Sequence, residues 1–117
     1  MFQDKKARIT ETQSWGSYFL LRISAPQIAR EARPGQFLMI RVSSGFNPLL
    51  RRPLSIHNCA GPEIEIFFQV TGEGTRLLSQ KIAGEKVDIL GPCGHGFSLK
   101  PEFKGQEIFC VGGGRGL

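Results

Sequence analysis

Arg52 is the residue in this sequence whose chemistry best suits an anion. Its guanidinium is a planar fork of donors that can hold a phosphate through two hydrogen bonds. It stands in the run Leu50-Arg51-Arg52-Pro53-Leu54-Ser55-Ile56, where Pro53 fixes φ and favours the start or the edge of a strand. In an extended chain, Ser55 shares one side with Pro53 and Leu54 faces the other way. The run would equally fit two solvated arginines that lead into an ordinary strand.

A second stretch with binding chemistry is Thr71-Gly72-Glu73-Gly74-Thr75-Arg76-Leu77-Leu78. Gly72 and Gly74 leave backbone N–H groups unobstructed, and Thr75 is the expected N-cap of a helix that follows. Free N–H groups and the positive end of a helix together suit a diphosphate. The stretch is not a Walker motif, because no Gly-Lys-Ser/Thr follows. The alternative interpretation is a plain glycine turn before a capped helix.

The remaining reactive side chains predict no catalysis and no metal site. His95 lies in the loop Gly91-Pro92-Cys93-Gly94-His95-Gly96-Phe97. The glycines of this loop would let its backbone pass close to a neighbouring group, which the sequence does not identify. No carboxylate or nucleophile forms a recognisable constellation with it, so a proton-transfer role is not favoured. Cys59, Cys93 and Cys110 are too widely and unequally spaced for a disulfide framework or a zinc site. We expect three reduced, mostly structural thiols.

The elements that position these residues are predicted to be mostly strands. Alternating apolar and polar residues between turn signals predict six strands, at 6–12, 18–24, 37–42, 52–58, 63–70 and 86–90. In 63–70 the apolar residues share one face while Glu63, Glu65 and Gln69 share the other, which predicts a strand with one wet side. Short turns and almost no helix favour a closed or nearly closed antiparallel barrel, since closure removes edge strands.

The connections are predicted from composition. Residues 27–32 form a loop or one short helical turn. Arg33-Pro34-Gly35 is a tight turn, because Pro at its second position and Gly at its third suit a type II bend. Residues 43–48 are expected to be loop.

Composition limits the classes of protein. A chain of 117 residues with 40% hydrophobic and 21% charged residues is expected to be one globular domain. No apolar run approaches the roughly 20 residues of a membrane helix, and no apolar segment follows the first charges as in a signal peptide. We therefore expect a cytoplasmic protein that does not bind membranes. The net charge of +5 comes from scattered cations, which suits one phosphorylated cofactor better than nucleic acid.

The last residues predict the beginning of another domain. An apolar strand at 107–111 runs into Gly112-Gly113-Gly114-Arg115-Gly116, as at the start of a dinucleotide-binding α/β domain, although the spacing is not a clean GxGxxG. We expect 1–101 to be the barrel domain and 102–117 to be a linker and the first strand of a truncated domain. Without neighbouring strands, Ile108, Phe109 and Val111 would be exposed. Such a segment would be disordered, fold back on the barrel or pair with another copy.

Four motifs in this order resemble the ferredoxin reductase-type flavoproteins. They are Arg-Pro-Leu-Ser, Gly-Glu-Gly-Thr before a helix, Gly-Pro-Cys-Gly-His-Gly-Phe and Val-Gly-Gly-Gly-Arg-Gly. The doubled arginine and Gly-Glu-Gly-Thr-Arg-Leu-Leu are most similar to the electron transfer subunits of dihydroorotate dehydrogenase. Each motif alone is weak, but together they cover residues 7–117.

The resemblance implies an all-β fold, a six-stranded antiparallel Greek-key barrel that binds FAD. The strand containing Pro53 would lie along the cofactor, with Arg52 on its phosphate and Ser55 near the reactive edge of the isoalloxazine. Leu54 stands where relatives often have a stacking tyrosine, and would supply an apolar contact. The pyrophosphate would lie on Gly72, Gly74 and Thr75.

The resemblance also implies partners beyond this chain. Full-length relatives continue through a nicotinamide-nucleotide domain and a cysteine-rich segment with a [2Fe–2S] cluster, so NAD and the cluster are expected only for the full-length protein. The cysteines here do not match a C-x4-C-x2-C spacing, and Arg115 replaces a usually small or aliphatic residue. The catalytic partner would be a dihydroorotate dehydrogenase-like subunit of pyrimidine biosynthesis.

The expected function is therefore that of the FAD-binding portion of an electron transfer subunit, which passes electrons among a partner flavoprotein, an iron–sulfur cluster and NAD. Alone, it should show no appreciable NADH oxidation, because the nicotinamide-binding surface would come from residues it lacks. Two alternatives stay open: a subunit of another ferredoxin reductase-type complex, such as a sulfide dehydrogenase or a glutamate synthase-like complex, and a flavin-free barrel that binds a partner protein or an anionic ligand.

Overall fold

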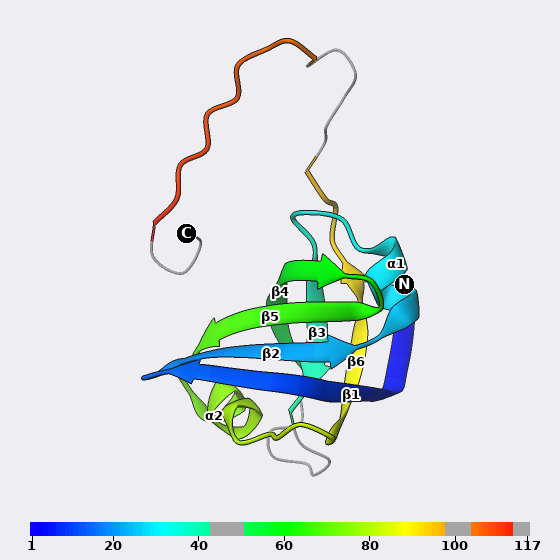
Figure 1. The fold of residues 1–117 in the computed structure, drawn as a ribbon, viewed down its shortest axis with the longest axis vertical. Helices are drawn as coiled ribbons and strands as arrows, with labels where there is room; N and C mark the ends of the chain where they lie inside the picture. Colours follow the sequence, from blue (N-terminus) through cyan, green and yellow to red (C-terminus); the bar gives the residue numbers. More distant parts are fainter. Residues whose placement is uncertain (43–50, 98–103, 114–117) are drawn as a thin grey trace.

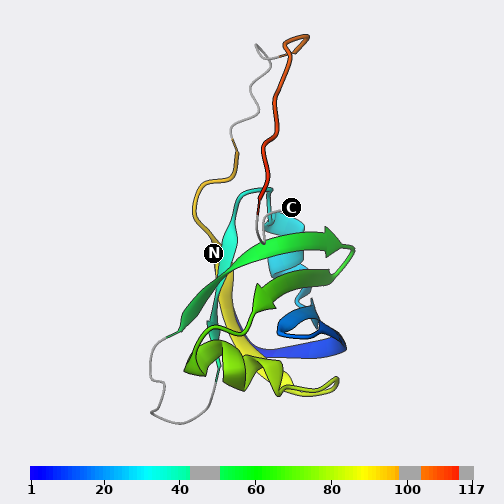
Figure 2. The same cartoon turned by 90° about the vertical axis from the view of Figure 1, so that its left-hand side faces the viewer.

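Six antiparallel strands close into a barrel in the order β1-β2-β5-β4-β3-β6 (Figure 1), which confirms the predicted fold. The computed structural model describes residues 1–42, 51–97 and 104–113. The strands are β1 (Phe2–Trp15), β2 (Tyr18–Ser24), β3 (Phe37–Arg41), β4 (Arg52–Ala60), β5 (Glu63–Gln69) and β6 (Lys86–Cys93). The helices are α1 (Pro26–Glu31) and α2 (Glu73–Ser79). Helix α2 lies at one end of the barrel and α1 lies toward the other end (Figure 2).

The core consists of the side chains that point into the barrel, which belong to every second residue along the strands. In β2, Leu21 and Ile23 are fully buried, and in β5 the same holds for Ile64 and Ile66. Successive side chains of a strand point to opposite faces, so this alternation fills the barrel from all sides. Leu78 of α2 is also fully buried, which attaches the helix to the barrel.

Strands β3, β4 and β5 end within two residues of the predicted positions, and β1 and β6 differ more. Strand β1 is longer, because it pairs with β2 along one part and with β6 along the other. Strand β6 continues through the Gly91–Cys93 segment that was predicted as loop. A Cβ at Gly91 would lie 2.6 Å from Leu38 Cδ2, so this close strand contact needs glycine.

Residues Pro26–Glu31 form a short helix, and Gly35 has the φ of +94° that the predicted type II turn requires. The predicted loop at 43–48 lies outside the described residues.

The outer face of β5 is not uniformly wet, contrary to the prediction. Glu65 is only 9% exposed, since neighbouring strands bring hydrogen-bond donors onto its carboxylate. Asn58 Nδ2 donates to it at 2.9 Å and Arg22 Nη2 at 3.2 Å. The hydrogen bond from Asn58 and the nearby Arg22 guanidinium lower the pKa of Glu65, against the opposing effect of burial.

Residues 104–113 form neither helix nor strand and lie outside the barrel, beginning far from it and running back toward it (Figures 1 and 2). The exposed fractions of Ile108, Phe109 and Val111 are 68%, 85% and 97%, as expected for an apolar segment with no strand beside it. The predicted first strand is therefore not formed within these residues, because a strand needs a neighbour to complete its hydrogen bonds. The domain boundary after residue 101 stays a prediction. Among the described residues, no helix has the length and apolar character needed to cross a membrane.

Candidate functional site

The barrel opens along β4. Within the described part of the chain, β4 pairs with β5 only from Ile56 to Ala60, and the register shifts just after Ile56. The preceding half of β4 pairs with β3 alone. Pro53 lies in this half, opposite Met39 of β3, so its missing N–H falls where β5 offers no partner. The barrel as a whole is closed, but within the described residues this half of β4 has a free edge on the side of β5. Pro53 therefore lies at a strand edge, as predicted.

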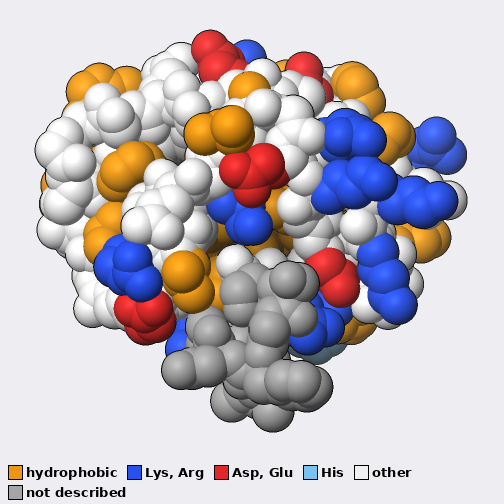
Figure 3. Space-filling view, turned by 90° about the horizontal axis from the view of Figure 1, so that it is seen from below, with side chains coloured by type: hydrophobic (Ala, Val, Ile, Leu, Met, Phe, Trp, Pro, Cys, Tyr) orange, Lys and Arg blue, Asp and Glu red, His pale blue; other side chains and the backbone are white. Residues whose placement is uncertain are grey.

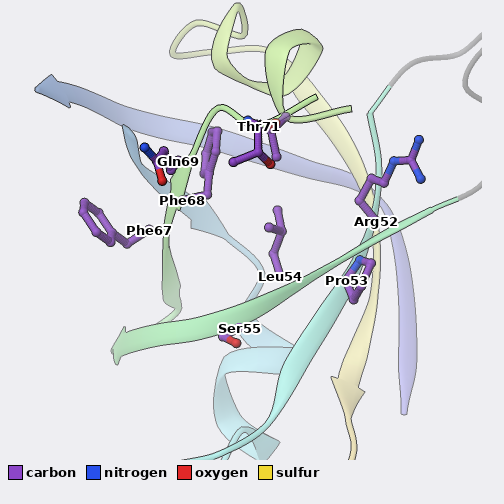
Figure 4. Close-up of a pocket in the computed structure, with 9 residues that line it drawn as sticks. Arg52, Pro53, Leu54, Ser55, Phe67, Phe68, Gln69 and Thr71 are labelled. Atoms are coloured by element: carbon purple, nitrogen blue, oxygen red, sulfur yellow. Dashed lines mark hydrogen bonds between the residues drawn. The ribbon is translucent and has the colours of Figure 1, made fainter. Parts of the chain in front are cut away.

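A pocket of about 420 Å³ occupies this opening (Figure 4). That volume is within the usual range of small-molecule sites. The lining residues come from β4, from the end of β5 and from the turn into α2: Arg52, Pro53, Leu54, Ser55, Phe67, Phe68, Gln69, Thr71 and Thr75. Five of the seven predicted site residues are therefore brought together, and the other two, Gly72 and Gly74, lie between Thr71 and Thr75 in the chain.

Arg52 lies against Gly74 at one end of this pocket. A Cβ at Gly74 would lie 2.5 Å from Arg52 Nε and 3.0 Å from its Cγ, so the arginine occupies the space that any side chain there would need. Among the described residues, the Arg52 guanidinium makes no hydrogen bond and no ion pair. Its charge and its fork of donors are therefore available to an anion in the pocket.

Thr75 shapes the turn from inside the helix, and its prediction as N-cap was wrong. Helix α2 begins at Glu73 with Gly72 as N-cap. The Thr75 hydroxyl accepts the N–H of Thr71 at 2.9 Å and that of Gly72 at 3.2 Å, and it donates to the Gly72 carbonyl at 3.2 Å. This is the backward half of a capping box, with the side chain at the third helical position holding the chain before the helix.

Gly72 is required neither by the backbone nor by protein packing. Its φ of −173° is extended, and a Cβ there would meet nothing within 4 Å. The space beside it is open to a bound group. The adjacent Glu73 is held by Arg76, whose Nε and Nη2 donate to the carboxylate at 2.9 Å and 2.6 Å. This bidentate pair lowers the pKa of Glu73 and offsets a negative charge that would oppose an anion.

One wall of the pocket was not predicted from the sequence; it is formed by Phe67, Phe68, Gln69 and Thr71. Phe67 carried a usable signal, because it is a large aromatic on a strand face otherwise made of Glu63, Glu65 and Gln69. In the structure its ring stacks on Tyr18 with centroids 5.7 Å apart. Phe68 is 3% exposed and stacks on Phe19 at 5.8 Å. The pocket thus has a cation at one end, and its walls combine aromatic and aliphatic side chains with the polar side chains of Ser55, Gln69, Thr71 and Thr75.

Figure 4 shows how β4 presents its side chains to this space. Leu54 points into the gap between β4 and Phe68, while Ser55 is turned to the other side of the strand and lies farther from Arg52. Figure 3 views the molecule from the end where α2 lies, and the surface there is hollowed between basic and hydrophobic side chains.

The glycine loop that contains His95 packs on protein. A Cβ at Gly94 would lie 2.9 Å from the Phe37 ring, and one at Gly96 would lie 2.8 Å from the Pro34 carbonyl oxygen. Gln36 Nε2 donates to the Gly94 carbonyl at 2.9 Å. Phe37 in turn pairs with Ser55, so the loop supports the strand that lines the pocket. His95 is not among the residues that line it.

Comparisons with known proteins identify similar sequences and a similar fold. No family model matches the chain. It is 48% identical over 86 residues to the dihydroorotate dehydrogenase B (NAD(+)) electron transfer subunit of Bacillus velezensis, covering 72% of this chain and 34% of that protein. The subunit of the same name from Desulforamulus reducens is 41% identical over 100 residues, covering 84% and 37%. The chain thus spans about a third of the length of the curated relatives it matches.

Solved structures show the same fold. An NADH-dependent reduced ferredoxin-NADP oxidoreductase, described in connection with flavin-based electron bifurcation, superposes with a TM-score of 0.72 at 28% identity, covering 80% of this chain and 34% of that one. A siderophore-interacting protein from Acinetobacter baumannii gives 0.66 at 20% identity, covering 91% and 45%, which supports the fold alone. The chain therefore matches the N-terminal part of dihydroorotate dehydrogenase electron transfer subunits, with a ferredoxin reductase-type barrel.

Proposed function

We propose that this chain is the flavin-binding portion of an electron transfer subunit of a dihydroorotate dehydrogenase-like oxidoreductase, and that it binds FAD between β4, β5 and α2. The observation that carries the proposal is the state of Arg52. Its guanidinium lies against Gly74, beside the open Gly72 position, and has no partner among the described residues. An arginine placed in this way at one end of a pocket with aromatic, aliphatic and a few polar side chains suits a ligand with a phosphate group and a flat ring system.

Each predicted residue has a role in this proposal. Arg52 would bind the diphosphate, and Gly74 would provide the flat surface against which the arginine lies. Gly72 would let the diphosphate approach the backbone, while Thr75 holds the turn in shape. Leu54 would contact the ring system, and the Ser55 hydroxyl would face its reactive edge. The bound flavin would supply the redox chemistry, and the protein would orient and tune it.

The wider activity follows the printed names of the relatives, which are electron transfer subunits of an NAD(+) enzyme. The complete protein would pass electrons among the flavin of a catalytic partner subunit, a [2Fe–2S] cluster, its own FAD and NAD. A subunit of another ferredoxin reductase-type complex is the second candidate, favoured by the likeness to the ferredoxin-NADP oxidoreductase. The protein that copurifies with the full-length chain would separate the two.

The proposal is tested by purifying the chain and identifying what it carries. We expect a yellow protein with the visible absorbance of an oxidised flavin, and we expect the chromophore released on denaturation to be FAD. A colourless protein that also stays colourless after incubation with FAD would overturn the proposal in favour of the flavin-free barrel.

A further inference from the structure

A second arginine, Arg51, connects β4 to β6 across the strand between them. Arg51 Nη2 donates to the Asp88 carboxylate at 2.8 Å, and Nη1 donates to the Asp88 backbone carbonyl at 3.1 Å. The two side chains are 22% and 20% exposed, so the pair is half-buried. Strand β3 lies between β4 and β6 in the barrel. The Arg51 side chain therefore reaches over β3 to make both contacts.

The strand register explains why these residues meet. Arg52 pairs with Ile40, and Arg41 pairs with Asp88. One step back along β4, Arg51 falls in the same cross-strand row as Arg41 and Asp88. Ile40 is fully buried inside the barrel, and alternation along a strand places Arg41 on the opposite, outer face. Arg51, Arg41 and Asp88 thus form one row on the outside of the barrel.

This row determines where the next residue points. Consecutive side chains of a strand face opposite ways, so an Arg51 held on the outer face directs Arg52 inward, to Gly74 at the α2 end. This part of β4 has no pairing with β5 among the described residues; it pairs with β3, and the Arg51–Asp88 contact links its start to β6. A slip by one residue would exchange the faces of the two arginines.

The Arg51–Asp88 contact also determines which of the two arginines is available to bind an anion. Arg51 makes an ion pair with the Asp88 carboxylate and a hydrogen bond to the Asp88 backbone carbonyl, whereas Arg52 makes no ion pair within the described residues. We propose that Asp88 and Arg51 are positioning residues that act through Arg52 and set the preference for a dinucleotide diphosphate. This inference rests on the proposed function, because it takes FAD as the ligand that Arg52 binds.

The test is a double-mutant cycle on FAD affinity, measured by titration of the flavin-free protein. Asp88→Asn removes the charge of the carboxylate, and we expect about a three- to thirtyfold loss of FAD affinity with a smaller loss for FMN. In an Arg52→Ala background, Asp88→Asn should cause no further loss, because its effect passes through Arg52. If Arg52→Ala binds too weakly to measure, Arg52→Gln, which also lacks the charge, replaces it in the cycle. Glu11→Gln is the matched control, since it breaks an arginine–carboxylate pair on β1 and should leave FAD affinity unchanged.

The outcomes separate the two ideas. Equal losses for FAD and FMN, or a loss from Asp88→Asn that persists in full in the Arg52 variant, would overturn the positioning role and leave the proposed function standing. Failure of the wild-type chain to bind FAD would overturn the proposed function and this inference with it.

Discussion

The two halves of β4 belong to one strand but differ in their strand pairing and in their role. From Ile56 to Ala60 the strand is paired with β5, and its Asn58 completes the hydrogen bonding of the nearly buried Glu65. From Arg52 to Ser55 it pairs with β3 alone, and the space left beside β5 is the pocket. In the first, closed half, hydrogen-bonded polar groups accompany strand pairing with β5. In the second, open half, a cation without a polar partner among the described residues lies beside an open wall, and this is the candidate site.

The largest expected effect comes from removing the unpaired cation of the open half. Arg52→Ala should weaken FAD binding by about 2–5 kcal/mol, because a bound diphosphate would lose its charged partner. The free energy of unfolding of the flavin-free chain should change little, since Arg52 has no polar partner among the residues that the structure describes. Calorimetric titration measures the first quantity and urea unfolding the second. Arg30→Ala, on α1, is the control and should leave FAD affinity unaltered.

The closed half should respond in the opposite way. Asn58→Leu removes the amide that donates to Glu65 and should cost about 1.5–3 kcal/mol of folding free energy, as for hydrogen bonds to charged groups, with FAD affinity retained. Gln13→Leu removes a similar amide–carboxylate contact on the surface and should cost much less. If both variants lowered the free energy of unfolding by similar amounts, the hydrogen bond from Asn58 to Glu65 would contribute no more to stability than the surface contact of Gln13.

The pH dependence of this effect has a definite sign. The pKa of Glu65 in the folded chain is lowered from its ordinary value of 4.5, first by the Asn58 hydrogen bond. Its contribution to stability is therefore complete above pH 4.5 and is lost as the pH falls through the lowered pKa. The stability difference between wild type and Asn58→Leu, followed by urea unfolding, should be full at pH 7 and shrink well below pH 4.5. A difference that grows on acidification would contradict the role given to Asn58.

A smaller effect should follow from filling the surface against which Arg52 lies. Gly74→Ala places a Cβ where the Arg52 side chain now is, so the arginine must move. We expect roughly a tenfold loss of FAD affinity, or about 1.4 kcal/mol, without loss of stability, because alanine favours a helix over glycine. Gly72→Ala is the companion variant, since its Cβ would touch no protein atom. A loss of FAD affinity in Gly72→Ala would therefore indicate that the bound ligand lies close to residue 72.

The smallest change should appear only in the redox behaviour of the bound flavin. Ser55→Ala should leave FAD bound and shift its reduction potential, since hydrogen bonds to the ring are a means of tuning a flavin. Equilibrium titration with a reference dye measures the potential, with Ser24→Ala as control. An unaltered potential would make Ser55 a purely structural residue.

The sequence was sufficient for the barrel, because alternation in segments such as β2 and β5 depends on local residue types. The order of motifs also singled out Arg52, Leu54 and Ser55, which line one pocket in the structure, and their role in flavin binding stays a prediction. The separation of β4 from β5 was not predictable, because strand register depends on partners far along the chain. Burial of Glu65 was missed for the same reason, as its donors come from the neighbouring strands β2 and β4.

Local ambiguity accounts for the other errors. Thr75 lies two positions after the first helical residue, and its hydroxyl satisfies the same N–H groups that an N-cap would serve, so the two placements differ little in sequence. The glycines of 91–96 predicted a close approach without saying to what. Only the structure shows that Gly91 approaches Leu38 and that Gly94 approaches Phe37.

The central claim is that the open half of β4 binds a dinucleotide through Arg52 and the turn at Gly72–Thr75. Titration of the flavin-free chain with FAD and with FMN under identical conditions tests it most directly, because the two ligands share the ring system and differ in the diphosphate and adenosine. We predict that FAD binds at least about tenfold more tightly. Equal affinities for FAD and FMN would contradict the claim.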